Sequence, residues 1–311
     1  MKVGIAAQRR PLWPKWDWIE QSFRSQGHET VRVTTLGELI EADKTCDCVL
    51  FDHREPGMGR KQIPGIERRS AWISWWFDLF LGQPHQPLID LYGNLNRCMD
   101  LVLVKERSML QQYRDRGINA EWFDQGVPDD YPALNHRESP EFDVVVFGTT
   151  MPEYQQRHRD VQCLVESGFK VAWASDENVP ENVTRFPWTH PDKLPELMSL
   201  GAFVLSVDLR HDIEGFRSDR FWLAVGAGAC VLKRASPGDS DIPCLMYDEL
   251  NHEVLGRLRT LVGDVEGRRT LGRQARATAM EHTYGKRVQE LVNRIQVYVD
   301  KRKNLPRVPW T

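Results

Sequence analysis

Arginines that lie between an apolar strand and a helix are the residues of this sequence best suited to chemistry. The segment VDLRHDIEGFRSDRFWLAVGAGACVL places Arg210 and Arg220 in and after a polar loop, and Ser218 with Asp219 precedes Arg220 as a helix N-cap would. Guanidinium groups and the amides of a helix N-terminus both attract anions. The segment therefore predicts a site for a phosphate-bearing ligand; the alternative is a capped surface helix with solvated arginines.

A glycine turn in VVVFGTTMPEYQQR is the second candidate anion site. Gly148 permits close backbone approach, and Thr149 and Thr150 add hydroxyls ahead of a predicted helix. In parallel sheets, ligands collect beyond the carboxyl ends of the strands. The alternative is an ordinary strand-to-helix turn, in which Glu153 only complements the helix dipole. The GxGxxG fingerprint is absent, which disfavours an ordinary dinucleotide dehydrogenase.

Two residues after predicted strands of the first half have the chemistry of a general base. Asp78 ends the aromatic run WISWWFD, and burial among Trp and Phe raises the pKa of a carboxylate toward the working range of a base. His53, which follows the strand ending at Asp52, is the second candidate. The alternatives are a capping role for Asp78 and a purely structural role for His53.

Basic residues near these strand ends suit an anionic acceptor. Gln8 and Arg9 follow the first predicted strand, and the loop 54–69 has five basic and two acidic residues, a net charge of +3. The residues expected to bind the acceptor are Gln8, Arg9, Arg54, Arg60 and Lys61; Arg68 and Arg69 complete the loop's basic set. Basic groups beside aromatic ones fit a DNA-type acceptor, because phosphates take the charge and bases stack. The alternative is a solvated loop.

The elements that must position these residues alternate between strand and helix. Runs such as VLVK are apolar on both faces, which is typical of strands in a buried parallel sheet. Strands are predicted at 2–7, 30–35, 48–52, 71–77, 101–105, 120–123, 143–147, 170–175, 203–207 and 230–233. Helices are predicted at 13–25, 36–42, 108–116, 153–166, 193–200 and 219–225, and over most of 248–303, with partly helical structure at 88–99. The pattern predicts an α/β protein of two facing Rossmann-like domains.

The predicted domain boundaries follow from a break in this pattern. Three prolines between Pro128 and Pro140, without periodicity, predict a linker at 128–141. We expect an N-terminal acceptor-binding domain at 1–127, a C-terminal nucleotide-sugar-binding domain at 142–284, and a final helix at 285–311.

Composition excludes several classes of protein. The 311 residues carry a net charge of −3, so no global attraction to nucleic acid or membrane is expected. No apolar run reaches the roughly 18 residues of a membrane span, and the N-terminus becomes charged before a signal sequence can form. Six cysteines without metal-ligand spacing predict reduced thiols in a cytoplasm, of a bacterium or a phage-infected cell. The eleven tryptophans favour an aromatic-walled groove.

Four segments together resemble one enzyme family. SDRFWLAVGAGACVL resembles the S-(D/N)-R-x-F-(D/E)-A-L-A-x-G-A segment of CgeB-like, group 1 glycosyltransferases, which have the GT-B fold. VVVFGTTMPEYQQRHRDVQCLVESGFKVAWAS is similar to that family's first unit of the C-terminal domain, and WFDQGV to its strand before the linker. EHTYGKRVQELVNRI resembles its H-(T/S)-Y-x-x-R-v terminal helix, which crosses back to the N-terminal domain. The resemblance covers most of residues 120–300.

The resemblance implies how a nucleotide-sugar donor would bind, without a metal or a resident cofactor. The diphosphate would lie against Gly148–Thr150, where Arg220 with Arg157 or Arg210 would neutralise its charge. The base would lie near Phe186–Trp188. Trp188 either stacks on the base or belongs to the core. A UDP-sugar is the expected donor. One departure matters, because the family's acidic ribose contact falls on Leu223 here, which leaves Asp219 or Glu214 for the ribose.

The expected function is therefore transfer of a sugar to a hydroxyl acceptor, with a hydroxymethylated base in phage DNA as one candidate. Alternatives are a glycosyltransferase acting on a cell-surface glycan or a small molecule, and a catalytically inactive protein that binds a nucleotide or glycan. A sugar-nucleotide epimerase on the same fold is a further alternative, for which the sequence has no distinct motif.

Overall fold

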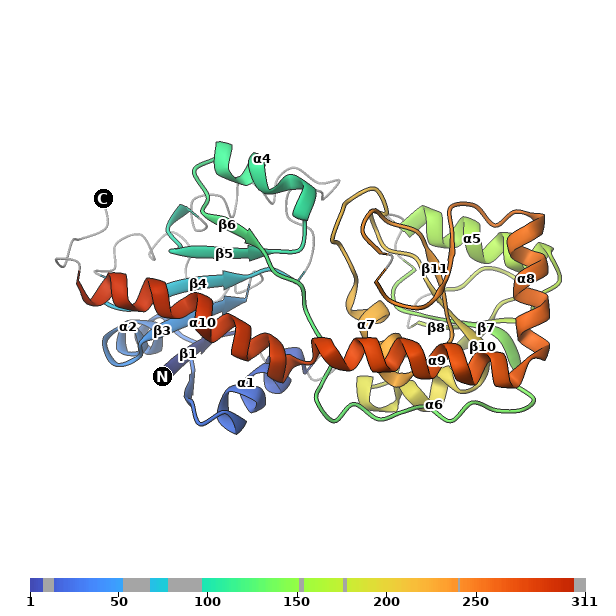
Figure 1. Cartoon of the computed structure of the whole chain (residues 1–311), viewed down its shortest axis with the longest axis horizontal. Coiled ribbons are helices and arrows are strands. Elements are labelled where there is room, and N and C mark those ends of the chain that lie inside the picture. Colours follow the sequence, from blue (N-terminus) through green and yellow to red (C-terminus); the bar gives the residue numbers. More distant parts are fainter. Residues whose placement is uncertain are drawn as a thin grey trace. The chain divides into compact units, whose positions relative to one another are not determined.

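The chain divides into two compact units. The computed structural model describes residues 1–7, 14–52, 68–77, 97–150, 154–175, 178–239 and 241–304. Unit 1 consists of Met1–Gln125 and Tyr284–Thr311, and unit 2 of Gly126–Thr283 (Figure 1). Each unit contains one parallel six-stranded sheet with helices on it, so the predicted α/β fold with two Rossmann-like domains is confirmed.

Unit 1 is built on a sheet with the strand order β2-β1-β3-β4-β5-β6. Its strands are β1 (Lys2–Ala6), β2 (Glu29–Arg32), β3 (Cys48–Asp52), β4 (Ala71–Trp75), β5 (Leu101–Val104) and β6 (Ala120–Trp122). Every residue of β3, β4 and β5 is buried, as expected for strands covered on both faces.

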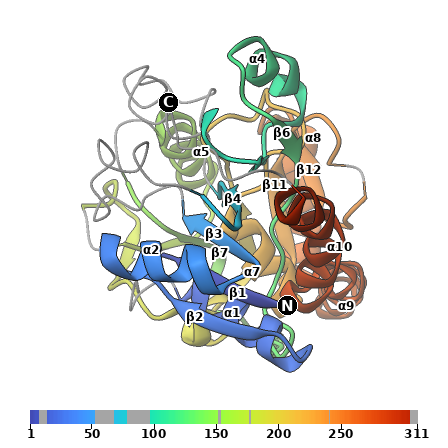
Figure 2. The ribbon, with the colours of Figure 1, turned by 90° about the vertical axis from the view of Figure 1, so that its left-hand side faces the viewer.

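Helices cover both faces of this sheet. They are α1 (Lys15–Ser25), α2 (Leu36–Thr45), η2 (Arg107–Met109), α4 (Leu110–Asp115) and α10 (Tyr284–Lys303). Buried residues of α1 and α10 share one core cluster, whereas those of α2 and α4 belong to another, and Figure 2 shows α2 and α10 on opposite sides of the strands. The terminal helix α10 buries a stripe at Val288, Leu291, Ile295 and Val299 against the first unit, which confirms the predicted return of this helix.

Unit 2 repeats the arrangement with the strand order β12-β11-β10-β7-β8-β9. Its strands are β7 (Phe142–Phe147), β8 (Val171–Ala174), β9 (Thr184–Phe186), β10 (Gly201–Ser206), β11 (Val231–Arg234) and β12 (Leu245–Tyr247). Its helices are α5 (Gln155–Glu166), η4 (Pro191–Lys193), α6 (Leu194–Met198), α7 (Asp219–Ala227), α8 (His252–Gly263), α9 (Val265–Ala279) and η5 (Met280–His282).

The proline-rich segment 128–141, predicted as a linker, is packed into unit 2. The Tyr131 hydroxyl donates to the Pro191 carbonyl at 2.8 Å, and the Leu134 amide donates to the carbonyl at the end of α7 at 2.8 Å. A His136 ring nitrogen lies 2.9 Å from the Gly228 carbonyl. Although the segment has no helix or strand, its polar groups are paired with the second unit, so it is part of that unit's structure.

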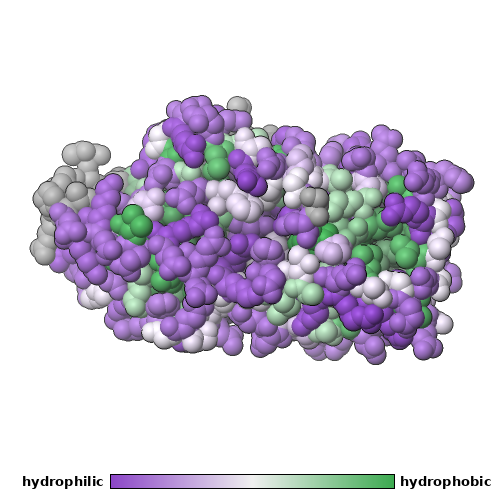
Figure 3. Space-filling model, in the orientation of Figure 1, coloured by the Kyte–Doolittle hydropathy of each residue, from purple (hydrophilic) through white to green (hydrophobic). Residues whose placement is uncertain are grey.

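Surface hydropathy differs between the units in the view of Figure 3. Hydrophilic residues cover most of unit 1 there, whereas hydrophobic residues gather on part of unit 2. A shallow pocket of unit 2 has an apolar lining that includes Cys244, Leu245, Leu261 and Leu271. None of the helices in the described ranges is both long and apolar enough to cross a membrane.

Candidate functional site

The carboxyl edge of the unit 2 sheet brings two predicted site segments together. Strands β7 and β10 are paired, so the turn after β7 and the loop after β10 begin side by side. Gly148 in the first turn has a φ of +116°, a conformation that favours glycine. A Cβ built at Gly148 would lie 2.7 Å from Arg220 Nη1, at the start of α7. The glycine is therefore required for the guanidinium to lie against the turn.

Arg157 ties the same two loops together from α5. Its side chain is 1% exposed, and it donates from Nη1 to the Thr149 carbonyl and from Nη2 to the Val207 carbonyl, both at 2.8 Å. Burial lowers the pKa of Arg157, and the positive charge of Arg220 lowers it further. Within the described part of the chain, neither arginine forms an ion pair with a carboxylate. Two guanidiniums therefore lie together beside the glycine turn, and the Asp208 carboxylate acts on Arg157 without forming an ion pair with it.

Tyr154, just before α5, completes this cluster, and the sequence reasoning missed it. The Arg157 guanidinium lies 4.0 Å and that of Arg220 5.3 Å from the centre of the Tyr154 ring. Burial alone would raise the pKa of Tyr154, but the two positive charges outweigh it and lower that pKa. The sequence feature that could have predicted this contact is the three-residue spacing between Tyr154 and Arg157, which places both residues on one side of a helix start.

A buried ion-pair network fixes the N-terminus of α7. Lys233 is fully buried, and its Nζ lies 3.1 Å from Asp208 Oδ2 and 2.7 Å from Asp239 Oδ2. Asp208 Oδ1 accepts from the Ser218 amide at 3.2 Å, and Ser218 Oγ caps the helix by accepting from the Phe221 amide. Desolvation lowers the pKa of Lys233, but the two carboxylates outweigh it and the net effect is a raised pKa. The feature of the sequence that indicates this network is Lys233, a charged residue near the end of an otherwise apolar strand.

The other residues predicted to bind the donor lie in the turn after β7, in the loops after β9 and β10, and at the start of α7. Thr149 offers its carbonyl to Arg157, and Thr150 its carbonyl to a His158 ring nitrogen at 2.9 Å. Asp219 is the first residue of α7, and Trp188 is half-buried after β9. Arg210 forms an ion pair with Asp212 at 2.5 Å, so its charge is already compensated.

Leu223, which stands where the resemblance expects an acidic residue, is 3% exposed within α7. A side chain buried this deeply belongs to the packing of the helix.

All predicted catalytic and acceptor-binding residues lie outside the described residues: Asp78, His53, Gln8, Arg9, Arg54, Arg60 and Lys61. In the sequence, His53 directly follows β3, and Gln8 lies two residues beyond β1. Asp78 follows the aromatic cluster at the end of β4, where the Trp75 and Phe77 rings lie 4.8 Å apart. These residues stay predictions.

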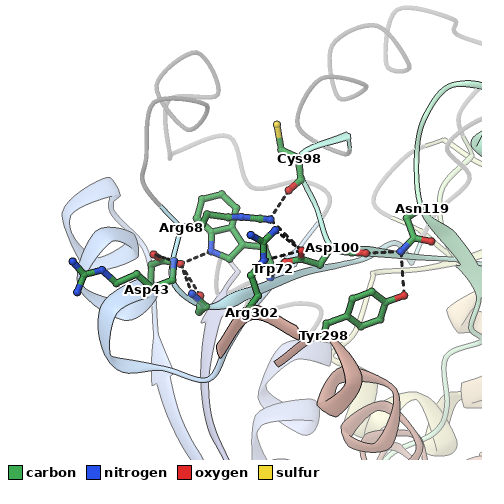
Figure 4. Close-up of polar contacts among 10 residues, drawn as sticks. Asp43, Arg68, Trp72, Cys98, Asp100, Asn119, Tyr298 and Arg302 are labelled. Atoms are coloured by element: carbon green, nitrogen blue, oxygen red, sulfur yellow. Dashed lines mark hydrogen bonds and ion pairs between the residues drawn. The ribbon is translucent and has the colours of Figure 1, made fainter. Parts of the chain in front are cut away.

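Two residues of the basic loop, Arg68 and Arg69, are described: Arg69 is exposed, whereas the expected part of Arg68 in an exposed basic surface is corrected. Figure 4 shows Arg68 and Arg302 converging on Asp100, at 3.0 and 2.5 Å. Nearby, Asp43 accepts from Trp72 Nε1 at 2.8 Å. Arg68 and Asp100 both precede strands, at the amino edge of the unit 1 sheet. Arg68 is buried and pairs with Asp100, which lies far along the chain, so its role is structural.

Groups of three metal-ligating His, Cys, Asp or Glu side chains do not occur among the described residues. The groups that the structure gathers at the Gly148 turn are two guanidiniums and the amides at the start of α7.

Comparisons with known proteins agree on one family. A family model described as "Glycosyl transferase-like" matches residues 132–293, more than half of the chain. No curated protein sequence matches significantly.

Solved structures share the fold at low sequence identity. Anabaena Alr3699/HepE, in complex with UDP and glucose, has a TM-score of 0.67 at 11% identity, over 95% of this chain and 99% of that one. T4 phage BGT, in complex with its UDP-glucose substrate, has a TM-score of 0.65 at 14% identity, over 98% and 100%. AviGT4, involved in avilamycin A biosynthesis, has a TM-score of 0.61 at 11% identity, over the whole of both chains. On this evidence the chain belongs to the glycosyl transferase-like family and is a glycosyltransferase with the GT-B fold.

Proposed function

We propose that the protein transfers a sugar from a UDP-sugar to a hydroxyl acceptor, and that unit 2 binds the donor at Gly148–Thr150. The observation that carries the proposal is the pair Arg157 and Arg220, held beside a glycine turn without a carboxylate partner in the described structure. Two of the structural relatives are named with UDP or UDP-glucose, which supports the choice of nucleotide.

This arrangement suits the departure of a nucleoside diphosphate. As the bond to the sugar breaks, negative charge grows on the leaving diphosphate, and fixed guanidiniums stabilise it most where water is excluded. The capped N-terminus of α7, with Ser218 and Asp219, adds backbone amides beside Arg220. We propose that these groups take the place of a metal ion in activating the leaving group.

The nucleoside must be held differently from the family pattern. Because Leu223 is buried, we propose that Asp219 or Glu214 accepts from the ribose hydroxyls. Trp188 is half-buried and is proposed to stack on the base. Arg210 has its own carboxylate partner in Asp212, so its contribution to the diphosphate is expected to be smaller than that of Arg220.

For the acceptor half of the reaction we propose Asp78 as the general base, with His53 as the alternative. Gln8, Arg9, Arg54, Arg60 and Lys61 are proposed to bind the acceptor. A DNA acceptor is supported by these basic residues and by the likeness to a DNA-modifying β-glucosyltransferase, at a TM-score of 0.61 and 11% identity. If DNA is the acceptor, its affinity falls as salt rises, and charge reversal of Arg60 and Lys61 reduces that slope. Efficient transfer to neutral sugars without any salt-dependent DNA binding would exclude DNA.

The cytoplasm of a bacterium or a phage-infected cell is the proposed location, in keeping with six free cysteines.

The experiment that tests the function is a panel of UDP-, GDP- and TDP-sugars, measured for binding and for hydrolysis without acceptor. Binding and slow hydrolysis of UDP-sugars are expected. Binding without any turnover would contradict the proposed transfer and indicate a protein that only binds the nucleotide. Formation of an epimer would show an epimerase, and no binding of any nucleotide would refute the proposal.

A further inference from the structure

The Tyr154 side chain contacts both arginines of the proposed donor site. The residue immediately precedes α5, and its side chain makes no capping hydrogen bond to that helix. Arg157 lies one helical turn further along α5, whereas Arg220 comes from α7 on the other side of the cluster. The tyrosine therefore links the starts of two helices that are far apart in the sequence.

The contacts of Tyr154 offset a repulsion inside the cluster. Arg157 and Arg220 carry like charges, and the proximity of Arg220 helps lower the pKa of Arg157. The Tyr154 ring lies 4.0 and 5.3 Å from the two guanidinium carbons, within the distance at which an aromatic face attracts a cation.

We propose that Tyr154 is a positioning residue that holds the Arg157 and Arg220 guanidiniums together for the donor diphosphate. Its ring attracts both cations and holds Arg220, the more exposed one, against the Gly148 turn. This inference rests on the proposed donor site. In the absence of a ligand, the neutral Tyr154 side chain stabilises the two positive charges of Arg157 and Arg220 at close distance.

The proposal has a spectroscopic consequence. Three charged groups act on the phenol, since Arg157 and Arg220 favour its ionised form and Asp208 opposes it. A bound diphosphate adds negative charge beside the phenol, so UDP raises the pKa of Tyr154. UDP binding then takes up a proton at alkaline pH, and affinity falls as pH rises through the lowered pKa of the free protein. The near-ultraviolet absorbance of tyrosinate decreases when UDP is added.

The test measures UDP affinity by calorimetry and the tyrosinate difference spectrum in the full-length wild type and three variants. Tyr154→Leu removes ring and hydroxyl and is expected to weaken UDP binding about tenfold, whereas Tyr154→Phe keeps the ring and stays within about threefold of wild type. Tyr154→Phe also loses the difference signal. Tyr131→Phe is the matched control, because its buried hydroxyl donates to the Pro191 carbonyl away from the arginines; it keeps both affinity and signal.

The outcomes separate this inference from the proposed function. A wild type that does not bind UDP refutes the donor site itself. Normal UDP affinity in Tyr154→Leu, or an unchanged difference signal in Tyr154→Phe, overturns the role of Tyr154 while the donor site stands. If Tyr154→Leu fails to fold, the signal in wild type and its loss in Tyr154→Phe still decide the matter.

Discussion

Each unit contains a pair of neighbouring arginines, and the two pairs differ in the groups that surround their guanidiniums. In unit 1, Arg68 and Arg302 share the carboxylate of Asp100, and the carboxylate of Asp43 also acts on Arg302, so two negative charges balance the two guanidiniums (Figure 4). In unit 2, Arg157 and Arg220 contact carbonyl oxygens and an aromatic ring but no carboxylate within the described residues. The first pair holds elements of the fold together; the second is the proposed binding site for the donor diphosphate.

The positions of the pairs in the sheets agree with this division. Arg68 and Asp100 precede β4 and β5, at the amino edge of the unit 1 sheet. Gly148 and the α7 N-terminus follow β7 and β10, at the carboxyl edge of the unit 2 sheet, where open parallel sheets bind ligands. We therefore propose that charge compensation, rather than the presence of arginine, distinguishes the structural pair of unit 1 from the proposed donor site of unit 2.

The largest expected effect contrasts two aspartates of unit 1. Asp78 follows β4 and Asp100 precedes β5, so we expect a role in turnover only for Asp78. Asp78→Asn keeps the shape and removes the basicity, and turnover should fall by a factor of about 10² to 10⁴ while UDP-sugar affinity stays within about threefold. Steady-state kinetics measure this. If His53→Gln abolishes turnover and Asp78→Asn does not, the roles are exchanged.

Asp100→Asn should affect stability instead. Removing the shared carboxylate leaves two largely buried guanidiniums uncompensated, and we expect the free energy of unfolding to fall by about 3 kcal/mol. Denaturant unfolding measures the loss, and calorimetry should find the UDP affinity unchanged. A variant of normal stability would show that the pair in unit 1 is not structural.

Gly148→Ala tests the close approach of Arg220 with a matched control. A methyl group at this positive-φ position would press on the Arg220 side chain, so UDP affinity should fall about tenfold. Gly168 also has a positive φ, +83°, but a Cβ there meets nothing within 4 Å. Gly168→Ala should therefore carry a similar backbone strain and bind UDP normally. Equal affinities in the two variants would remove the site from the glycine turn.

Much of the fold was predictable because its strands are apolar and its helices periodic. Ten of the twelve strands match predicted ones to within a few residues. The two that were missed, β9 and β12, are three-residue strands at the edges of the unit 2 sheet. Their sequences, TRF and LMY, are too short to show any period, and only pairing with a neighbour makes them strands. The prolines of segment 128–141 predict a loop, and the segment was therefore predicted as a linker. A proline pattern does not indicate which residues such a loop packs against.

The parts of the candidate site that could be predicted are those in which the residue type alone indicates the role. Glycine after a strand and arginine after a Ser-Asp cap led to Gly148 and Arg220, which the structure brings together. Long-range partners were not predictable: Arg68 looked like part of an exposed basic loop, yet its carboxylate partner lies 32 residues away. Tyr154 was missed for the same reason, because its second arginine comes from α7.

The central claim, that Arg157 and Arg220 bind the donor diphosphate, is tested most directly by titrating UDP into Arg220→Ala and Arg302→Ala side by side. Each variant removes one guanidinium, from the unit 2 pair and from the unit 1 pair respectively. The account predicts that Arg220→Ala weakens UDP binding by about 1.5–3 kcal/mol, the contribution of a hydrogen bond to a charged group, while Arg302→Ala binds as the wild type does. Unchanged affinity in Arg220→Ala, or an equal loss in both variants, would contradict it.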